Sequence, residues 1–162
     1  MKTVLTHYTQ YNLWANNTII DIIEKLTVEQ YVEPQKSSFK SIQETIFHIA
    51  DVEYNWLQRL QQNNTWEAKA TNYGNDVNAL KIFLIAQSTN LTQLVAESNI
   101  TELMQPIGYK NLKGETFNTE LYKILMHVVN HGTHHRGQIY TMLHGAGYNA
   151  LPSIDFIKYV RL

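Results

Sequence analysis

The sequence predicts an all-α protein that folds as a four-helix bundle. Apolar residues recur every three or four positions through four long segments, which is the spacing of a buried helix face. Helix-start and helix-stop residues flank these segments. Hydrophobic residues make up 44% of the 162 residues, enough to bury a core, and no repeat or composition shift marks a second domain. We therefore expect one helical-bundle domain over residues 1–162.

The first helix is predicted to run from about Leu5. A residue that precedes proline disfavours the helical conformation, so this helix should end before Glu33 and Pro34. Asn12 occupies an inward-facing position and interrupts the apolar stripe of the helix. The other inward-facing residues are Leu5, Tyr8, Ala15, Ile19, Ile22 and Leu26.

Capping signals mark the starts of the second and third helices. The second begins near Ser41, because Ser41 and Glu44 have the spacing of a capping box, and it ends in the polar run 61–64. The third follows Asn75 and Asp76, which can cap it. The inward-facing residues are Ile42, Ile46, Ile49, Trp56 and Leu60 in the second helix and Leu80, Leu84, Leu91 and Val95 in the third.

The helical period breaks before the last long helix. The stretch Met104–Asn118 alternates apolar and polar residues, which predicts a short irregular or hairpin excursion. A fourth helix is then expected over about Thr119–His144, closed by Gly145 and Gly147. The tail that starts at Leu151 is expected to pack back on the bundle through Ile154, Ile157 and Val160.

Charge, cysteine content and hydropathy exclude several classes of protein. Lys plus Arg total 13 and Asp plus Glu total 14, so the net charge of -1 gives no electrostatic reason to expect a nucleic-acid partner. The absence of cysteine excludes disulfides, thiolate metal ligands and a cysteine nucleophile. No apolar run reaches the roughly 20 residues that span a bilayer, and no secretory signal opens the chain. We therefore expect a cytoplasmic protein with no membrane partner.

Histidine is the unusual residue of this sequence. Four of its 7 histidines fall between His127 and His135 in the fourth helix. On a helical wheel with Val128 on the core face, His135 lies about 20° and His131 about 60° away, so both point inward. His127 and His134 lie about 100° and 120° away, on the shoulder or outside. The wheel therefore selects His131 and His135, which are one helical turn apart.

Two inward imidazoles at this spacing can hold one metal ion from the same helix. Because the chain lacks cysteine, a third ligand must be His, Asp or Glu from another helix, and His48 is the leading candidate. Gly132 and Thr133 follow His131 where the HExxH zinc motif has its glutamate, which argues against a metalloprotease of that type. The competing interpretation is that these are core histidines satisfied by hydrogen bonds, although burying two rings without partners is costly.

Other polar residues carry weaker signals. Asn12 and Arg136 are candidates for residues that support a metal ligand or contact a substrate. For Asn12, a buried structural role is an equal alternative, and for Arg136 we favour pairing with a carboxylate of a neighbouring helix. Asp51 and Glu53 are interpreted as part of a solvated helix face.

The segment HVVNHGTHHRGQ at residues 127–138 resembles the signature of the DinB/YfiT-like superfamily. Three further pieces agree in the same order along the chain: YNLWAN at 11–16, His48, and PSID at 152–155. The resemblance implies a four-helix bundle of up-down-down-up connectivity, often a homodimer. It also implies a divalent metal ion, with zinc or nickel expected, held by three histidines. Carried over residue by residue, these ligands are His48, His131 and His135.

The resemblance also leaves three functions open. Some relatives are S-transferases that use bacillithiol, mycothiol or glutathione, and others are described as metal-dependent hydrolases. We expect metal-dependent transfer of a low-molecular-weight thiol onto an electrophilic small molecule, in a stress response or detoxification, because three histidines leave a coordination position open for a thiol. The alternatives are hydrolysis by a metal-bound water and a non-catalytic, structural metal-binding bundle. The superfamily's link to DNA damage concerns induction of expression and implies no DNA binding.

Overall fold

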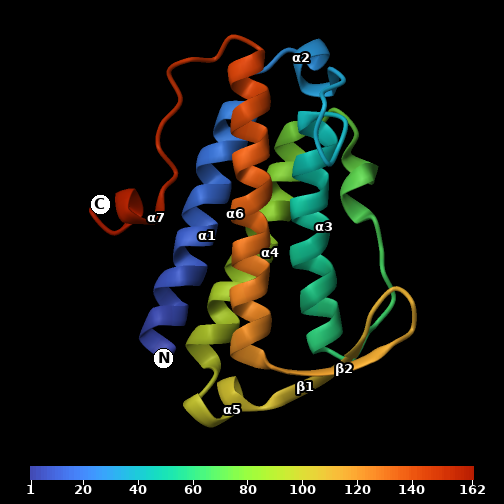
Figure 1. Ribbon diagram of the computed structural model, residues 1–162, viewed down its shortest axis with the longest axis vertical. Helices are drawn as coiled ribbons and strands as arrows, with labels where there is room; N and C mark the ends of the chain where they lie inside the picture. Colours follow the sequence, from blue (N-terminus) through green and yellow to red (C-terminus); the bar gives the residue numbers. More distant parts are fainter.

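The computed structural model describes residues 1–162 and contains four long helices (Figure 1). These are α1 (Lys2–Ile23), α3 (Ile42–Leu60), α4 (Val77–Glu97) and α6 (Leu121–Gly145). The shorter elements are α2 (Val28–Val32), the 3-10 helix η1 (Lys69–Tyr73), α5 (Ile100–Met104), strands β1 (Pro106–Lys110) and β2 (Thr116–Glu120), and α7 (Phe156–Tyr159). No helix combines the length and the apolar character that crossing a membrane requires.

The long helices form a bundle with up-down-down-up connectivity, as expected. In Figure 1, α1 rises from the N-terminus, α3 and α4 both descend, and α6 rises again. The chain returns from the lower end of α3 to the upper end of α4 through residues 61–76, which include η1. Each of α1 and α3 packs against both α4 and α6. The antiparallel neighbours α3 and α6 are the two helices that carry the predicted metal ligands.

The predicted helix starts and the hairpin are confirmed. Ser41 Oγ accepts from the backbone N–H of Glu44 at 3.1 Å, and Asp76 caps α4 by accepting from Ala79 N–H at 2.9 Å. The Glu44 carboxylate bonds to the N–H of Lys40, one residue before the cap. The excursion is an antiparallel hairpin in which β1 pairs with β2.

The predicted first helix is wrong in one respect, because it is two helices. α1 ends at Ile23 and α2 starts after Thr27. Thr27 and Gln30 form a reciprocal capping box, which satisfies backbone donors locally and favours a new helix start over continuation. The break allows Tyr31, which is 2% exposed, to cover the upper end of the core.

The tail packs back on α1, but two of the three predicted contact residues are wrong. Tyr11 Oη donates to the carbonyl of Ile154 at 3.1 Å, whereas Ile157 and Val160 are 53% and 47% exposed. Aromatic rings of α7 make the contact instead, since they offer more area than an aliphatic side chain in a one-turn helix. The rings in this cluster are Tyr8, Tyr11, Trp14, Phe156 and Tyr159.

The interior contains an upper and a lower apolar cluster. The upper cluster, toward α2, includes Ile19, Ile46, Leu84 and Ile139. The lower cluster, toward the hairpin, includes Leu57, Leu91, Leu125 and Val128. Along every long helix, the residues between the two clusters include polar ones, and the candidate site lies at that height.

Candidate metal centre

Three histidines from two helices converge at mid-height of the bundle. His48 comes from the middle of α3, and His131 and His135 from successive turns of α6. Nε2 of His131 lies 3.1 Å from Nε2 of His48 and 3.1 Å from Nε2 of His135. One ligand atom from each of the three rings lies within 4.8 Å of the others. The structure therefore brings together the three residues that spacing and resemblance selected.

Gln138 sets the position of the proton on His135. The Gln138 side-chain nitrogen lies 2.9 Å from Ser38 Oγ and 3.2 Å from Nε2 of His134, so its Oε1 faces Nδ1 of His135 at 2.8 Å. Because Oε1 can only accept, the neutral His135 ring carries its proton on Nδ1. The lone pair of its Nε2 is then directed at His131.

The three nitrogens suit a shared cation better than they suit one another. Nε2 of His131 carries at most one proton and faces two other ring nitrogens, so at most one of its two contacts is a well-formed hydrogen bond. A cation among three lone pairs removes this conflict. In a tetrahedral zinc site with Zn–N of about 2.0–2.1 Å, ligand nitrogens lie about 3.4 Å apart, close to the 3.1 Å that separates Nε2 of His131 from each of the other two. The donor set therefore fits a divalent cation that accepts imidazole ligands.

Burial lowers the pKa of all three histidines. Loss of hydration, followed by the effect of neighbouring imidazoles, lowers the pKa of His48 to about 4 and that of His131 to about 3. The pKa of His135 is also lowered by burial, while its hydrogen bond to Gln138 opposes the shift. The three rings are therefore neutral at pH 7, the form that binds metal ions.

Aromatic residues and a small cavity border the histidines. The Phe39 ring packs on His48, with centroids 4.3 Å apart, and its centroid lies 5.5 Å from that of His135. A cavity of about 250 Å³ adjoins His48 on this side. Its lining residues are Phe39, Glu44, Phe47, His48, Asp51, Trp66, Ala68 and Thr71. A small molecule that enters this cavity lies beside the His48 ring.

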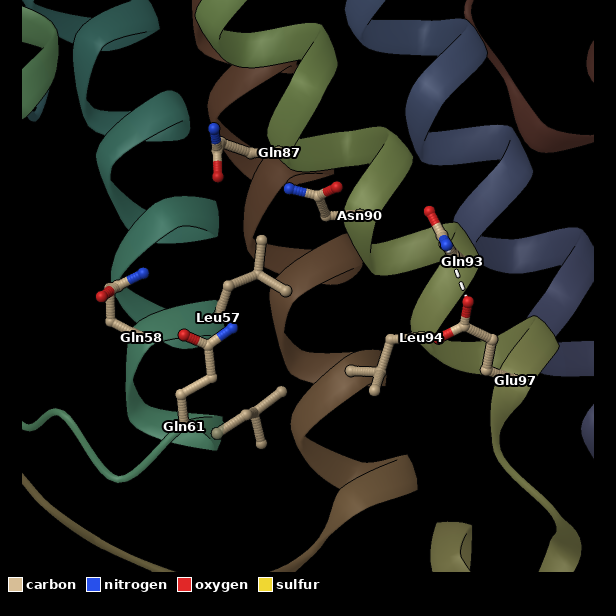
Figure 2. A pocket seen from close by; sticks show the side chains of 9 residues that line it. Leu57, Gln58, Gln61, Gln87, Asn90, Gln93, Leu94 and Glu97 are labelled. Carbon is tan, nitrogen blue, oxygen red and sulfur yellow. Dashed lines mark hydrogen bonds between the residues drawn. The ribbon is translucent and has the colours of Figure 1, made fainter.

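A larger cavity, of about 410 Å³, lies between α3 and α4 and is shown in Figure 2. Leucines and amide side chains make up most of its lining, together with Glu97, which accepts from Gln93 at 2.7 Å. It contains no histidine and no cluster of metal-ligating groups. It is therefore separate from the candidate centre.

His127 and His134 lie at the edge of the site, as the helical wheel predicts. Both are exposed. The ring centroid of His127 is 5.9 Å from that of His131, and the centroid of His134 is 4.9 Å from that of His135. Neither joins the group of three whose nitrogens converge.

A buried polar layer crosses the bundle beside the histidines. It consists of Asn12 and Asn16 on α1, Glu53 on α3, Ser88 on α4 and Arg136 on α6. Glu53 accepts hydrogen bonds at 2.7 Å from each of Asn12, Asn16 and Ser88. Arg136 Nη1 donates to the amide oxygens of Asn12 at 2.8 Å and Asn16 at 2.7 Å. The two asparagines thus bridge a buried carboxylate and a buried guanidinium.

The expectation of a solvated face at Asp51 and Glu53 is wrong. Asp51 and Glu53 are 5% and 1% exposed. Asp51 Oδ1 accepts from the N–H of Ala70 at 2.8 Å and so ties η1 to α3, while burial raises the pKa of its carboxyl to about 6. Burial also raises the pKa of Glu53, against the effect of its hydrogen-bond donors. Both carboxyls have structural partners that sequence spacing alone did not identify.

Asn12 and Arg136 bond within the polar layer and make no hydrogen bond to a histidine ring. Arg136 was expected to pair with a carboxylate of a neighbouring helix. It is linked to the Glu53 carboxylate on α3 through the side chains of Asn12 and Asn16 rather than by direct contact. Gly132 leaves the space for this arrangement, because a Cβ there would lie 2.8 Å from Arg136 Nη1 and 3.1 Å from Asn12 Oδ1. Arg136 adjoins His135 in sequence, so the same turn of α6 serves the layer and the site.

Sequence reasoning missed Glu53, Asn16 and Ser88 as buried residues. The helical spacing of the sequence could have identified two of them, Glu53 and Asn16. Glu53 falls seven residues after Ile46 on the inward stripe of the second helix, and Asn16 lies one turn after Asn12. No such signal distinguishes Ser88, whose hydroxyl is recognisable only from its contact with Glu53.

Two curated relatives from Bacillus subtilis (strain 168) are similar to this chain. Protein DinB is 26% identical over 151 residues, which cover 89% of this chain and 87% of that protein. The uncharacterized protein YizA is 24% identical over 132 residues, covering 80% of each.

Solved structures share the fold. YfiT from Bacillus subtilis, described as a probable metal-dependent hydrolase with an unusual four-helix bundle topology, matches with a TM-score of 0.66 and 17% identity, covering 88% of this chain and 87% of that one. The DinB-like protein YjoA from Bacillus subtilis matches with a TM-score of 0.66 and 16% identity, covering 91% and 97%. The sequence model of the DinB family matches residues 1–162. With this match over the whole sequence, the chain belongs to the DinB family.

Proposed function

We propose that this protein is a metal-dependent enzyme whose divalent cation is held by His48, His131 and His135. The convergence of their three nitrogens, with spacings of 3.1 Å at His131, supports the proposal most directly. Three protein ligands are the number found in catalytic zinc sites, where a further position stays open. When bound, the cation supplies one chemical effect: it lowers the pKa of a thiol or water at that position into the neutral range.

The chain's own residues hold and shape this site. Gln138 fixes the His135 proton on Nδ1 and so keeps Nε2 available as a ligand. Phe39 covers the His48 ring and limits the access of water from that side. The cavity beside His48 has room for part of a small organic molecule.

Thiol transfer is the reaction that we favour. The carboxylates in the cavity beside His48, Glu44 and Asp51, already accept hydrogen bonds from the backbone N–H groups of Lys40 and Ala70, which makes them poorly suited to act as the general base for a water nucleophile. Because the chain has no cysteine, the thiol would come from a small-molecule cosubstrate. Hydrolysis is the second candidate, since the structural relative YfiT is described as a probable metal-dependent hydrolase.

The ligand assignment is tested by elemental analysis of the purified protein and of His131→Ala and His135→Ala. We expect one divalent cation per chain in the wild type and little in either variant. His134→Ala is the matched control, because His134 adjoins His135 but faces outward, and it should keep its metal. Unchanged metal content in both ligand variants would end the assignment.

The reaction is tested on protein loaded with cobalt(II). Addition of glutathione or bacillithiol should produce a sulfur-to-cobalt charge-transfer band. The loaded protein should then catalyse arylation of the thiol by chlorodinitrobenzene, with release of chloride. Hydrolysis of p-nitrophenyl acetate without a thiol, with no such band, would support the second candidate instead. Full metal binding without turnover in either assay, together with a large loss of melting temperature in the ligand variants, would favour a structural role.

A further inference from the structure

Arg59, near the lower end of α3, is a buried cation without a polar partner. It is only 8% exposed. Its guanidinium takes part in none of the ion pairs and side-chain hydrogen bonds of the protein, although burial lowers its pKa and so disfavours its charge. Arg136, the other buried arginine, makes three hydrogen bonds. Buried charges are normally paired, so the isolation of Arg59 requires an explanation.

Aromatic rings hold the Arg59 side chain in place. Its Cζ lies 4.9 Å from the ring centroid of Trp56 and 5.9 Å from that of Trp66, both within the range of cation–π contact. The ring of Tyr109 on β1 packs edge-to-face against the ring of Trp56, with centroids 4.9 Å apart, and belongs to the same aromatic cluster. These contacts orient the guanidinium but leave its N–H donors without acceptors.

The guanidinium nitrogens of Arg59 are not completely enclosed by the protein, although the residue is largely buried. The only buried side-chain nitrogen or oxygen atoms without a hydrogen-bond partner in the protein are Tyr31 Oη and Arg136 Nε. The nitrogens of Arg59 also lack a partner and are not among them, so water or a ligand can reach them. Arg59 therefore presents a planar fork of donors, held between aromatic rings, at an accessible point.

Arg59 lies on the same side of α3 as the candidate metal centre. It follows His48 by eleven residues, three turns of helix, which places their Cα atoms about 16 Å apart. A row of rings joins the two: Trp56 lies 5.6 Å from His127, and His127 lies 5.9 Å from His131. A molecule that contacts both the histidines and Arg59 would therefore extend along the Trp56 and His127 rings.

We propose that Arg59 binds an anionic group, a carboxylate or a phosphate, of the small molecule that reacts at the three histidines. The unpaired donor fork recognises such a group bidentately, and Trp56 and Trp66 flank it. The link to a reaction rests on the proposed function, whereas binding of an anion at Arg59 does not require the metal. In thiol transfer, the group suits a thiol cosubstrate that carries carboxylates several bonds from its sulfur.

Tryptophan emission tests the anion site, because two of the three tryptophans contact Arg59. The metal-free full-length protein is titrated with sodium phosphate and, separately, with sodium succinate, at ionic strength held constant with sodium chloride. We expect a saturable change in emission with at least one anion. Arg59→Met, which keeps the apolar contacts, should bind at least tenfold more weakly. Lys113→Met, which removes an exposed cation from the hairpin connection, should bind as the wild type does.

Two further variants separate this proposal from the metal assignment. His131→Ala should keep the anion response, and Arg59→Met should keep its metal content. Loss of the anion response in His131→Ala would place the anion at the histidines and overturn the proposal, as would equal binding by Arg59→Met and wild type, or no saturable response to either anion. A response to succinate alone or to phosphate alone identifies the acidic group and supports the proposal.

Discussion

Burial controls the protonation of the site histidines at the scale of single residues. The pKa of His48, about 4, and that of His131, about 3, lie below the ordinary histidine value of about 6.5. At pH values between the lowered pKa of the folded state and the ordinary pKa of the unfolded state, the unfolded chain binds more protons than the folded one. Their contribution to stability is therefore fully present above about pH 6.5 and is lost as pH falls toward 4.

We accordingly expect the metal-free protein to melt at a lower temperature as pH decreases from 7.5 to 5. Asp51 acts in the opposite direction, because its raised pKa favours the protonated folded state in acid. The informative quantity is therefore the difference in melting temperature between the wild type and His131→Gln at each pH. The melting temperature of His131→Gln should fall less over the same range. Identical pH profiles for the two proteins would contradict a depressed pKa at His131.

Gly132 and Gly137 provide a matched pair of residue-scale substitutions on α6. Gly132→Ala should destabilise the protein by about 1 to 3 kcal/mol, because its Cβ would meet Arg136 Nη1 at 2.8 Å. Gly137→Ala meets nothing within 4 Å and should stabilise the helix by about 1 kcal/mol. Urea unfolding measures both. A stabilising Gly132→Ala would show that the guanidinium can move aside without cost.

At the scale of elements, the polar layer links all four long helices at one level. It lies between the upper and lower apolar clusters, and it includes Glu53 on the helix of His48 and Arg136 on the helix of His135. Hydrogen bonds of fixed length resist sliding of one helix along another, whereas apolar contacts tolerate it. The layer therefore fixes the register in which α3 and α6 present their histidines.

A double-mutant cycle tests this coupling between helices. Arg136→Met leaves Glu53 buried without its cationic neighbour and should cost about 3 to 5 kcal/mol in the free energy of unfolding. The double variant Glu53→Leu and Arg136→Met should be more stable than the sum of the single effects predicts, by about 1 kcal/mol or more. Simple additivity would mean that the two charges act independently.

Sequence patterns predicted elements well where the signal was local. Ser41 and Asp76 mark helix starts because a cap needs only its own turn. The break after Ile23 was missed because Leu26 continues the apolar period, and only the capping pair Thr27 and Gln30 signals it. The tail was placed on the wrong side chains because its partner surface on α1 is aromatic, which the tail sequence does not reveal.

At the scale of the whole molecule, the proposed metal binding would be coupled to folding. A cation that binds the folded histidines and not the unfolded chain should stabilise the protein by about 2.7 kcal/mol when its free concentration is 100 times the dissociation constant. Thermal melts with and without zinc should therefore differ by several degrees. His48→Ala should abolish the difference, and His134→Ala should preserve it. An equal zinc effect in His48→Ala would show that zinc binds elsewhere.

A 3.6-residue period within one segment was enough to predict the long helices, their buried faces and the inward direction of His131 and His135. Resemblance added the connectivity and agreed with His48 as the third histidine, which the search for a ligand on another helix had already made the leading candidate. The meeting of Glu53, the asparagines, Ser88 and Arg136 across helices is visible in the folded protein alone, as is the lack of a polar partner at Arg59. The contacts of the layer join residues 35 to 124 positions apart, and no periodicity along one helix encodes the distance to another.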